Sequence, residues 1–276
     1  MMAEVQTTEG IVGFFDILGY ENLLENNEPE DVLKNVISAI EQVPSETIRN
    51  ISGGLNSPRF GNSRAVINEL DWLAFSDTIL LTMPYESDDD TGKALKWVVF
   101  LLASEKLMQL MWIKGLPLRG AVDIGRFVVK GNFFAGRPIV EAYRMSHSLD
   151  LAAAVLTKRA EDEFRGLLLQ DDYRQIHDQL RLIVVDYLVP RKREKPEKLT
   201  TLNFFSVIGG GHYLPTGDPR QFVCRTFWKN NKDIPREAQS KVDNTEQYVR
   251  FLIERFRDVF GISDSSHGSK QGNVGK

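Results

Sequence analysis

The chain has 276 residues, of which 42% are hydrophobic and 26% charged, a composition typical of a globular protein with a substantial core. This length predicts one large domain or two small ones. The formal net charge of −4, without a stripe rich in Lys and Arg, provides no basic surface for nucleic acid, so we expect no nucleic-acid partner. The basic run 191–195 is interpreted as an exposed turn.

Cysteine and histidine are too few for several common kinds of site. The single cysteine, Cys224, cannot form an internal disulfide, and the four histidines show no metal-ligand spacing. The N-terminus lacks the pattern of a signal peptide, and the longest apolar stretch, 97–112, contains charged residues and is too short to span a membrane. We therefore expect a soluble cytoplasmic protein with no membrane partner.

The first predicted element is an apolar strand that contains one carboxylate. Apolar, β-branched and aromatic residues along Ile11–Ile17 favour a strand buried on both faces, and Gly19 allows a tight turn after it. An ionised Asp16 inside this run is costly unless it is paired or binds a cation. A hydrogen-bonded Asp at a strand end is the simpler alternative.

A second carboxylate is expected beside the first. Residues 69–83 read as two strands joined by a short polar turn at Ser76-Asp77, and a hairpin next to the first strand would place Asp77 beside Asp16. Two neighbouring carboxylates repel each other unless a positive charge lies between them. Oxygen ligands favour a hard divalent cation such as Mg²⁺ or Mn²⁺.

Helices are predicted on both sides of this hairpin. The first helix begins at Glu28-Pro29-Glu30 and its apolar stripe extends to Val43, and 44–64 is predicted to be a loop from which Arg59 could reach a substrate. The acidic run 86–90 is expected to cap a helix at about 93–114 rather than to bind a metal.

The remaining core elements complete an α+β fold. A second hairpin is predicted over Leu118–Val129, turning near Gly125, followed by a helix that starts near Pro138 and contains Arg144. The order strand, helix, strand, strand, helix, strand fits a ferredoxin-like β-α-β-β-α-β core with C-terminal additions.

Several further elements are expected after this core. They are a strand at 151–157, a helix at 158–168, a hairpin of strands 183–188 and 201–207, and a terminal helix from Asp243 to Phe260. The polar, Gly-rich end is predicted to be disordered. We therefore expect three parts: a main domain at 8–208, a C-terminal extension with a terminal helix at 209–261, and a disordered tail at 262–276.

Four motifs in this order resemble those of class III nucleotidyl cyclases. Residues 15–20 (FDILGY) resemble the first metal motif, Asp77 falls at the second metal aspartate, and 118–125 (LRGAVDIG) resemble the β-hairpin motif. Gly136 and the helix carrying Arg144 resemble the part of the family that supplies a transition-state arginine. The resemblance covers residues 10–205 and implies that 8–208 is a cyclase catalytic domain.

The chain departs from the purine cyclases at the base pocket. At the family's offsets from Asp77 and Arg144, the positions of the adenine-reading Lys and Asp hold Leu73 and Phe133, and that of the transition-state Asn holds Val140. Large apolar side chains suit a smaller base, so the pattern resembles the pyrimidine cyclases of Pycsar bacterial anti-phage systems. The resemblance implies conversion of UTP to 3′,5′-cyclic UMP and pyrophosphate, with CTP as the alternative substrate, and a product that signals to a separate effector.

The resemblance also implies a mechanism and an assembly. Asp16, Asp77 and the carbonyl of Ile17 would hold two divalent cations about 3.5–4 Å apart, for in-line attack of the ribose 3′-hydroxyl on the α-phosphorus. In a head-to-tail homodimer, Arg144 of the partner subunit would complete each site. The residues implied in nucleotide binding are Phe14, Ile17, Leu18, Gly19, Tyr20, Arg59, Leu73 and Phe133.

Two other functions remain open. Because Val140 replaces the Asn, the chain could be a non-catalytic sensor with a degenerate cyclase fold that only binds a nucleotide. A third hypothesis is an unrelated metal-dependent phosphodiesterase, which the scarcity of histidine disfavours.

Overall fold

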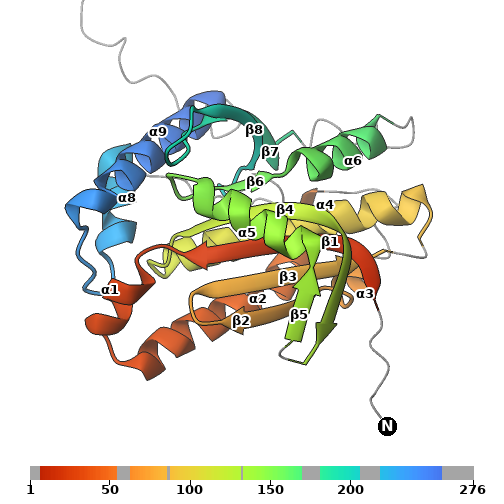
Figure 1. The fold of residues 1–276 in the computed structure, drawn as a ribbon, viewed down its shortest axis with the longest axis horizontal. Helices are drawn as coiled ribbons and strands as arrows, with labels where there is room; N and C mark the ends of the chain where they lie inside the picture. The colour runs from red at the N-terminus through yellow and green to blue at the C-terminus, as the bar shows by residue number, and fades with distance from the viewer. Residues whose placement is uncertain are drawn as a thin grey trace, which may run out of the picture.

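The computed structural model describes residues 7–54, 63–85, 88–131, 133–169, 181–205 and 218–256. It shows an α+β fold in which helices cover both faces of one open, mixed sheet (Figure 1). None of the helices in the described ranges is long and apolar enough to cross a membrane.

The centre of the sheet has the predicted ferredoxin-like topology. Its four strands are β1 (Thr8–Ile17), β2 (Asp71–Phe75), β3 (Thr78–Pro84) and β4 (Leu118–Lys130). They lie in the order β2-β3-β1-β4, and every neighbouring pair is antiparallel. The crossover helices α2 (Pro29–Gly54) and α4 (Asp90–Ile113) lie behind the sheet in Figure 1. The β-α-β-β-α-β core is therefore confirmed.

The C-terminal additions extend the sheet beyond β4. Strand β6 (Ala154–Leu156) runs parallel to β4, and the antiparallel strands β8 (Glu197–Leu202) and β7 (Val184–Val189) follow it. Strand β5 (Phe133–Gly136) pairs with the far end of β4. Helix α5 (Arg137–Ser148) covers the front face in Figure 1. The other helices are α1 (Tyr20–Glu25), α3 (Ser63–Ile67), α6 (Lys158–Leu168), α8 (Pro219–Trp228), η4 (Arg236–Ala238) and α9 (Gln239–Arg255).

Successive side chains of β1 point to opposite faces of the sheet, one covered by α5 and the other by α4. Phe14 and Asp16 point to the α5 side, where the Phe14 ring meets Tyr143 edge-on at a centroid distance of 5.4 Å. On the α4 side, Phe15 is fully buried, and a Cβ at Gly13 would lie only 3.0 Å from the ring of Phe100. Strand β1 is therefore buried on both faces, as predicted.

The predicted loop at 44–64 is wrong in its first half. Helix α2 continues through Pro44 to Gly54, because Val43, Thr47 and Ile51 keep the buried face in helical register. Burial of this face outweighs the backbone hydrogen bond that Pro44 cannot donate. Residues 55–62, with the predicted ligand Arg59, lie outside the described part of the chain.

The predicted turn at Gly125 is also wrong. Strand β4 runs through it, with Gly10 of β1 opposite Gly125, and the hairpin to β5 turns after Lys130 instead. Gly125 has a φ of 136°, a backbone conformation that residues other than glycine rarely adopt, and the pairing of β4 with β1 continues through it.

The elements after β8 differ in part from expectation. Helix α8 was not predicted, and α9 begins at Gln239, so Asp243 lies inside the helix and bonds to Arg220 instead of capping it. The predicted end at Phe260 and the predicted tail lie outside the described residues. The Trp112 ring of α4 stacks on Phe222 of α8 at 5.5 Å and 22°. The described part of the extension therefore packs directly on the core.

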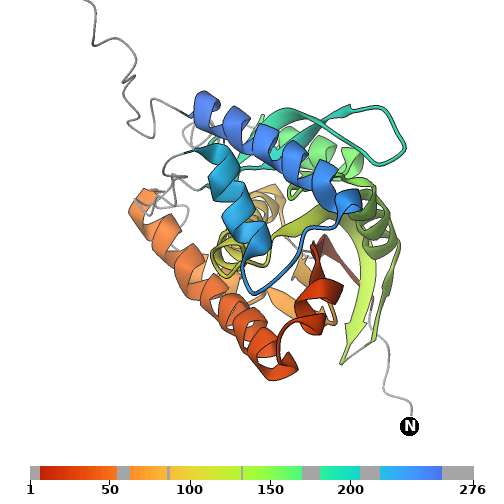
Figure 2. The same ribbon diagram turned by 90° about the vertical axis from the view of Figure 1, so that its left-hand side faces the viewer.

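The loop between α8 and η4 attaches this extension to the end of α4 (Figure 2). Lys232 Nζ donates to the carbonyl of Gly115 at 2.6 Å, and Asn230 donates to that of Lys114 at 2.8 Å. Asn27, just after α1, donates to the carbonyl of Asn230. These bonds satisfy carbonyls that the end of α4 leaves without helical partners.

Burial of Lys232 gives a testable pH dependence. Desolvation lowers the pKa of Lys232 to about 8, from an ordinary value of 10.5. Between pH 8 and 10.5 the unfolded chain binds this proton more tightly than the folded protein does, so the free energy of unfolding rises with pH in this range. Below pH 8 the lysine is protonated in both states and contributes no pH dependence. We expect urea titrations from pH 8 to 9.5 to give a free energy of unfolding that rises more steeply for the wild type than for Lys232→Met, by up to ~1.4 kcal/mol per pH unit. Parallel profiles would contradict this.

Candidate functional site

A buried ion pair lies where β1 ends. Asp16 of β1 is directly opposite Arg119 of β4, and both residues are more than nine-tenths buried. Arg119 donates from Nε and Nη2 to Oδ2 of Asp16, at 2.7 and 2.6 Å. Because both contacts go to Oδ2, Oδ1 is the oxygen that Arg119 does not use.

Asp77 approaches this pair from the turn between β2 and β3. Its carbonyl accepts a hydrogen bond from the N–H of Ile17 at 2.8 Å, which fixes the turn against the end of β1. The preceding Ser76 has a φ of 55°, unusual for a residue other than glycine. The structure thus places Asp77 beside Asp16, where the sequence predicted it.

The two carboxyl groups influence each other. Burial raises the pKa of Asp16 above its ordinary value; the Arg119 charge opposes this, while the contact with Asp77 adds to the rise. A divalent cation would relieve the repulsion between the two carboxylates. Two carboxylates and nearby carbonyls are the oxygen donors that Mg²⁺ and Mn²⁺ prefer, so the residues fit such an ion. The described residues contain no cluster of three acidic, His or Cys side chains that could hold a metal, so further ligands must come from the backbone, a substrate or water.

The turn after β1 is only partly available for phosphate. The N–H of Ile17 is used by Asp77, and that of Leu18 donates to the carbonyl of Pro117 at 2.9 Å. Among the described residues, no acceptor lies within hydrogen-bond reach of the N–H groups of Gly19 and Tyr20. Two of the four N–H groups of this turn therefore anchor it to neighbouring strands and loops, and those of Gly19 and Tyr20 are the ones left for a phosphate.

Arg144 does not join the two aspartates within one chain. It lies on α5 with a side chain that is 67% exposed, and it pairs with Glu141 at 3.3 Å. Together with Asp123 and Arg159 it lines a cavity of about 430 Å³. Asp123 is four positions from Arg119 along β4, which is about 13 Å at the rise of a β-strand. The structure therefore brings Asp16 and Asp77 together and leaves Arg144 at the surface.

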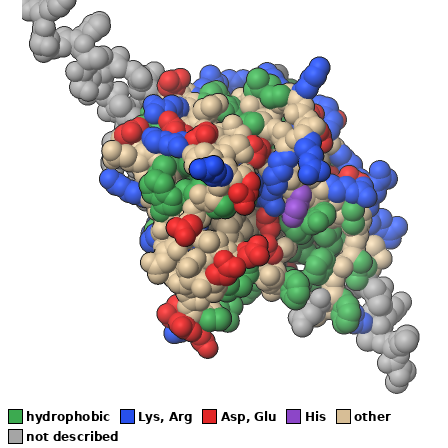
Figure 3. All heavy atoms as spheres, turned by 60° about the vertical axis from the view of Figure 1, so that its left-hand side comes forward, with side chains coloured by type: hydrophobic (Ala, Val, Ile, Leu, Met, Phe, Trp, Pro, Cys, Tyr) green, Lys and Arg blue, Asp and Glu red, His purple; other side chains and the backbone are tan. Residues whose placement is uncertain are grey.

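The predicted base-pocket residues lie at an exposed apolar surface. Phe133 on β5 is 83% exposed, Val140 on α5 is 44% exposed, and Leu73 on β2 is half-buried. Phe75 and Tyr143 add further exposed aromatic area. Figure 3 shows apolar side chains gathered beside the histidine on this face, with basic side chains on its other side. Within one chain these residues form no closed pocket for a base.

Two basic residues near Asp16 were missed from the sequence. His147 of α5 has a lowered pKa, first from burial and then from the charge of Arg119, and its ring contacts that of Tyr143 at 4.2 Å. Burial and the charges of Arg119 and Lys241 lower the pKa of Lys192 to about 8. Lys192 and Arg191 are half-buried, so the exposed-turn interpretation applies only to 193–195. No local pattern marks either residue, because the fold alone places them here.

Comparison with known families and with curated proteins finds no match. Solved structures with a similar fold include the adenylyl cyclase CyaB from P. aeruginosa, which is 14% identical over 73% of this chain and 96% of that chain, with a TM-score of 0.43. The guanylyl cyclase Cya2 is 13% identical over 78% of this chain and 100% of that chain, with a TM-score of 0.40. At these identities and TM-scores the likeness carries no argument about activity, so function is argued below from this chain's residues.

Proposed function

We propose that this protein is a class III nucleotidyl cyclase that converts a nucleoside triphosphate to its 3′,5′-cyclic monophosphate and pyrophosphate. The observation that supports this most directly is the meeting of Asp16 and Asp77 at the end of β1, beside the turn at Gly19. Both carboxylates belong to the segments whose sequence resembles the metal motifs of this family.

The residues of this site have distinct proposed roles. Asp16 and Asp77, with the carbonyl of Ile17, would hold two Mg²⁺ or Mn²⁺ ions, which would supply charge neutralisation and activation of the ribose 3′-hydroxyl. Arg119 favours the ionised form of Asp16 despite its burial, as its effect on the pKa of Asp16 indicates. The N–H groups of Gly19 and Tyr20 are directed at phosphate oxygens.

The active enzyme is proposed to be a head-to-tail homodimer. Arg144 is exposed and lines a cavity that neither Asp16 nor Asp77 lines, so we assign it to a site completed by a second molecule. Its planar guanidinium suits the equatorial oxygens of a transferring phosphoryl group. Phe75, Phe133 and Tyr143 provide exposed apolar area for such an interface.

The proposed substrate is UTP, with CTP as the alternative. Leu73 and Phe133 lack the hydrogen-bonding groups that read adenine at these positions in the purine cyclases, and their bulk favours the smaller base. By the same resemblance, the product serves as a second messenger in Pycsar anti-phage defence and acts on a separate effector. Phe14, under Tyr143 at 5.4 Å, is proposed to support the nucleotide from the sheet.

Incubation with each nucleotide tests this proposal. Purified protein with Mn²⁺ is incubated separately with ATP, GTP, CTP and UTP, and products are separated against 3′,5′-cyclic standards. We expect cyclic UMP from UTP, no product in EDTA, and no product from the Asp77→Ala protein. A cyclic purine product would contradict the argument from Leu73 and Phe133, and no product from any nucleotide would contradict the cyclase.

A non-catalytic nucleotide sensor is the second candidate. Two observations favour it: Val140 stands where the family has Asn, and Oδ2 of Asp16 is already bonded to Arg119. In that case, calorimetry would detect nucleotide binding without turnover.

A further inference from the structure

A second cavity lies at the opposite end of the sheet from the two aspartates. In the described part of the chain, β7 pairs only with β8 and so forms an edge of the sheet. Beside this edge, α6 and α9 enclose a cavity of about 530 Å³, which we call the β7-edge pocket. Its apolar wall includes Phe164, Val184 and Phe251, and its charged rim consists of Arg165, Arg181, Asp186, Lys198 and Arg255.

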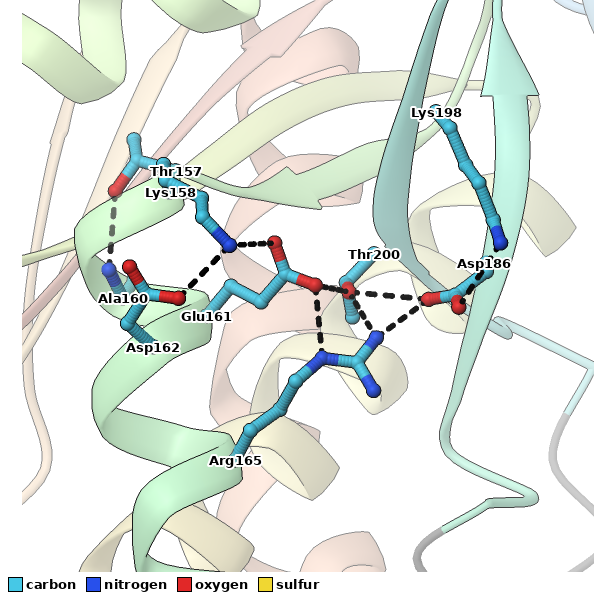
Figure 4. Close-up of polar contacts among 9 residues, drawn as sticks. All are labelled: Thr157, Lys158, Ala160, Glu161, Asp162, Arg165, Asp186, Lys198 and Thr200. Carbon is cyan, nitrogen blue, oxygen red and sulfur yellow. Dashed lines mark hydrogen bonds and ion pairs between the residues drawn. The ribbon is translucent and has the colours of Figure 1, made fainter.

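The rim has an excess of positive charge. Four of the lining residues are Lys or Arg, whereas Asp186 is the single carboxylate among them. Asp186 already accepts a bond from Arg165 at 2.5 Å and lies 3.7 Å from Lys198 Nζ (Figure 4). Arg165 is compensated by Asp186 and also by Glu161, so the charge that the pocket offers to an anion is that of Arg255.

Arg165 and Arg255 differ in how far their donors are already used. Arg165 also donates to Glu161 at 2.8 Å and to Thr200 at 2.9 Å, so the network in Figure 4 fixes its guanidinium in place. Among the described residues, Arg255, in the last turn of α9, forms no ion pair or side-chain hydrogen bond. With respect to the described part of the chain, its planar set of donors is available to bind a phosphate group from two N–H positions.

The pocket also has aromatic rings beside these cations, since Phe251 lies one helical turn before Arg255 on α9 and Phe164 directly precedes Arg165 on α6. Phe164 is 2% exposed and held by the core, and Phe251 packs against Tyr187 at a centroid distance of 5.0 Å, so both rings are rigidly placed. The volume of this cavity falls within the range of small-molecule sites. We propose that the β7-edge pocket binds a nucleoside monophosphate, with its phosphate on Arg255 and its base against the apolar wall.

The pocket is separate from the site at Asp16, but the two are connected. Four strand spacings separate β7 from β1, which is about 19 Å. The β7–β8 hairpin runs from the pocket to Lys192, whose N–H donates to the carbonyl of Ser148 at the end of α5 at 2.7 Å. A ligand at the pocket is therefore not the substrate of the Asp16–Asp77 site, and it contacts a hairpin that reaches that site.

Calorimetric titration with UMP tests this inference independently of the proposed activity. The Asp77→Ala protein is used in EDTA, so that neither turnover nor metal-dependent binding contributes. We expect binding that Arg255→Ala weakens about 10-fold or more, because a charge-assisted hydrogen bond is lost. Arg250→Ala is the matched control on the same helix, since Arg250 pairs with Glu246 and Asp218 outside the pocket, and it should bind like the parent.

Two further titrations distinguish the parts of the ligand. Inorganic phosphate and uridine should each bind at least about 10-fold more weakly than UMP, because each lacks one half of the proposed contacts. Equal binding of phosphate and UMP would contradict the apolar contact. An unchanged affinity in Arg255→Ala, an equal loss in Arg250→Ala, or no binding of UMP would each overturn the proposal. Thermal melts of both variants confirm that they are folded.

Discussion

The Asp77→Ala and Arg144→Ala proteins are each expected to make cyclic nucleotide at least ~10²-fold more slowly than the wild type, and an equimolar mixture of the two is expected to recover activity. Asp77 is half of the carboxylate pair, and loss of a preorganised donor such as Arg144 costs ~10²–10³ in rate. In a mixed dimer one site carries both defects and the other carries neither. Half of the dimers in an equimolar mixture are mixed, and each has one intact site, so recovery should approach about one quarter of wild-type activity.

This complementation experiment has clear controls. Arg137→Ala removes another exposed arginine from α5 and should not abolish activity on its own, since Arg137 is assigned no part in the transition state. Native mass spectrometry shows whether mixed dimers have formed. Mixed dimers without recovered activity would contradict the shared site, and activity within about tenfold of the wild type in either single variant would contradict the role given to that residue.

Tyr248→Ala is expected to have the largest effect on stability, lowering the free energy of unfolding by ~3–5 kcal/mol. The Tyr248 side chain is fully buried, and its hydroxyl donates to the carbonyl of Leu202 at 2.7 Å and contacts Thr201 Oγ1 at 3.0 Å. The ring lies 4.8 Å from that of Tyr187 on β7. Truncation therefore leaves a cavity between α9 and the sheet as well as unpaired polar groups.

Urea denaturation of matched variants separates these contributions. Tyr248→Phe keeps the ring and should cost only ~1–1.5 kcal/mol, the loss of its hydrogen bonds. Leu188→Ala, at a 60% exposed position on β7, should change stability by no more than ~0.5 kcal/mol. If Tyr248→Ala had an effect as small as that of Leu188→Ala, the C-terminal extension would not be an integral part of the fold.

The core was predictable because local patterns and tertiary packing agree there. The apolar run of β1 and the turn at Ser76-Asp77 predicted two strand ends, and their pairing brings the two carboxylates together. The length of α2 was not predictable from local signals, because Pro44 marks a boundary in most contexts. Burial of Thr47 and Ile51 against neighbouring elements overrides that signal.

The charged surroundings of Asp16 depend on register and could not be read from the sequence. Arg119 belongs to a motif that was recognised, but only the alignment of β4 against β1 sets it opposite Asp16. Lys192 comes from a turn that looked like ordinary basic surface, and His147 had no neighbouring ligand in the sequence. Asp16, Arg119, His147 and Lys192 are far apart along the chain, so no local sequence pattern predicts that they lie close together in the fold.

The cross-strand pairing of Asp16 with Arg119 also has a consequence for biosynthesis. The two residues are 103 positions apart, and Gly115 and Lys232 are 117 apart. On the ribosome, β1 emerges long before the strand that neutralises its carboxylate, and the end of α4 emerges long before its capping loop. Contacts of such long range form slowly and leave apolar strands exposed in the meantime. During synthesis, Asp16 therefore stays without its ion-pair partner until β4 has been made. A fragment that ends before β4 cannot contain the Asp16–Arg119 pair.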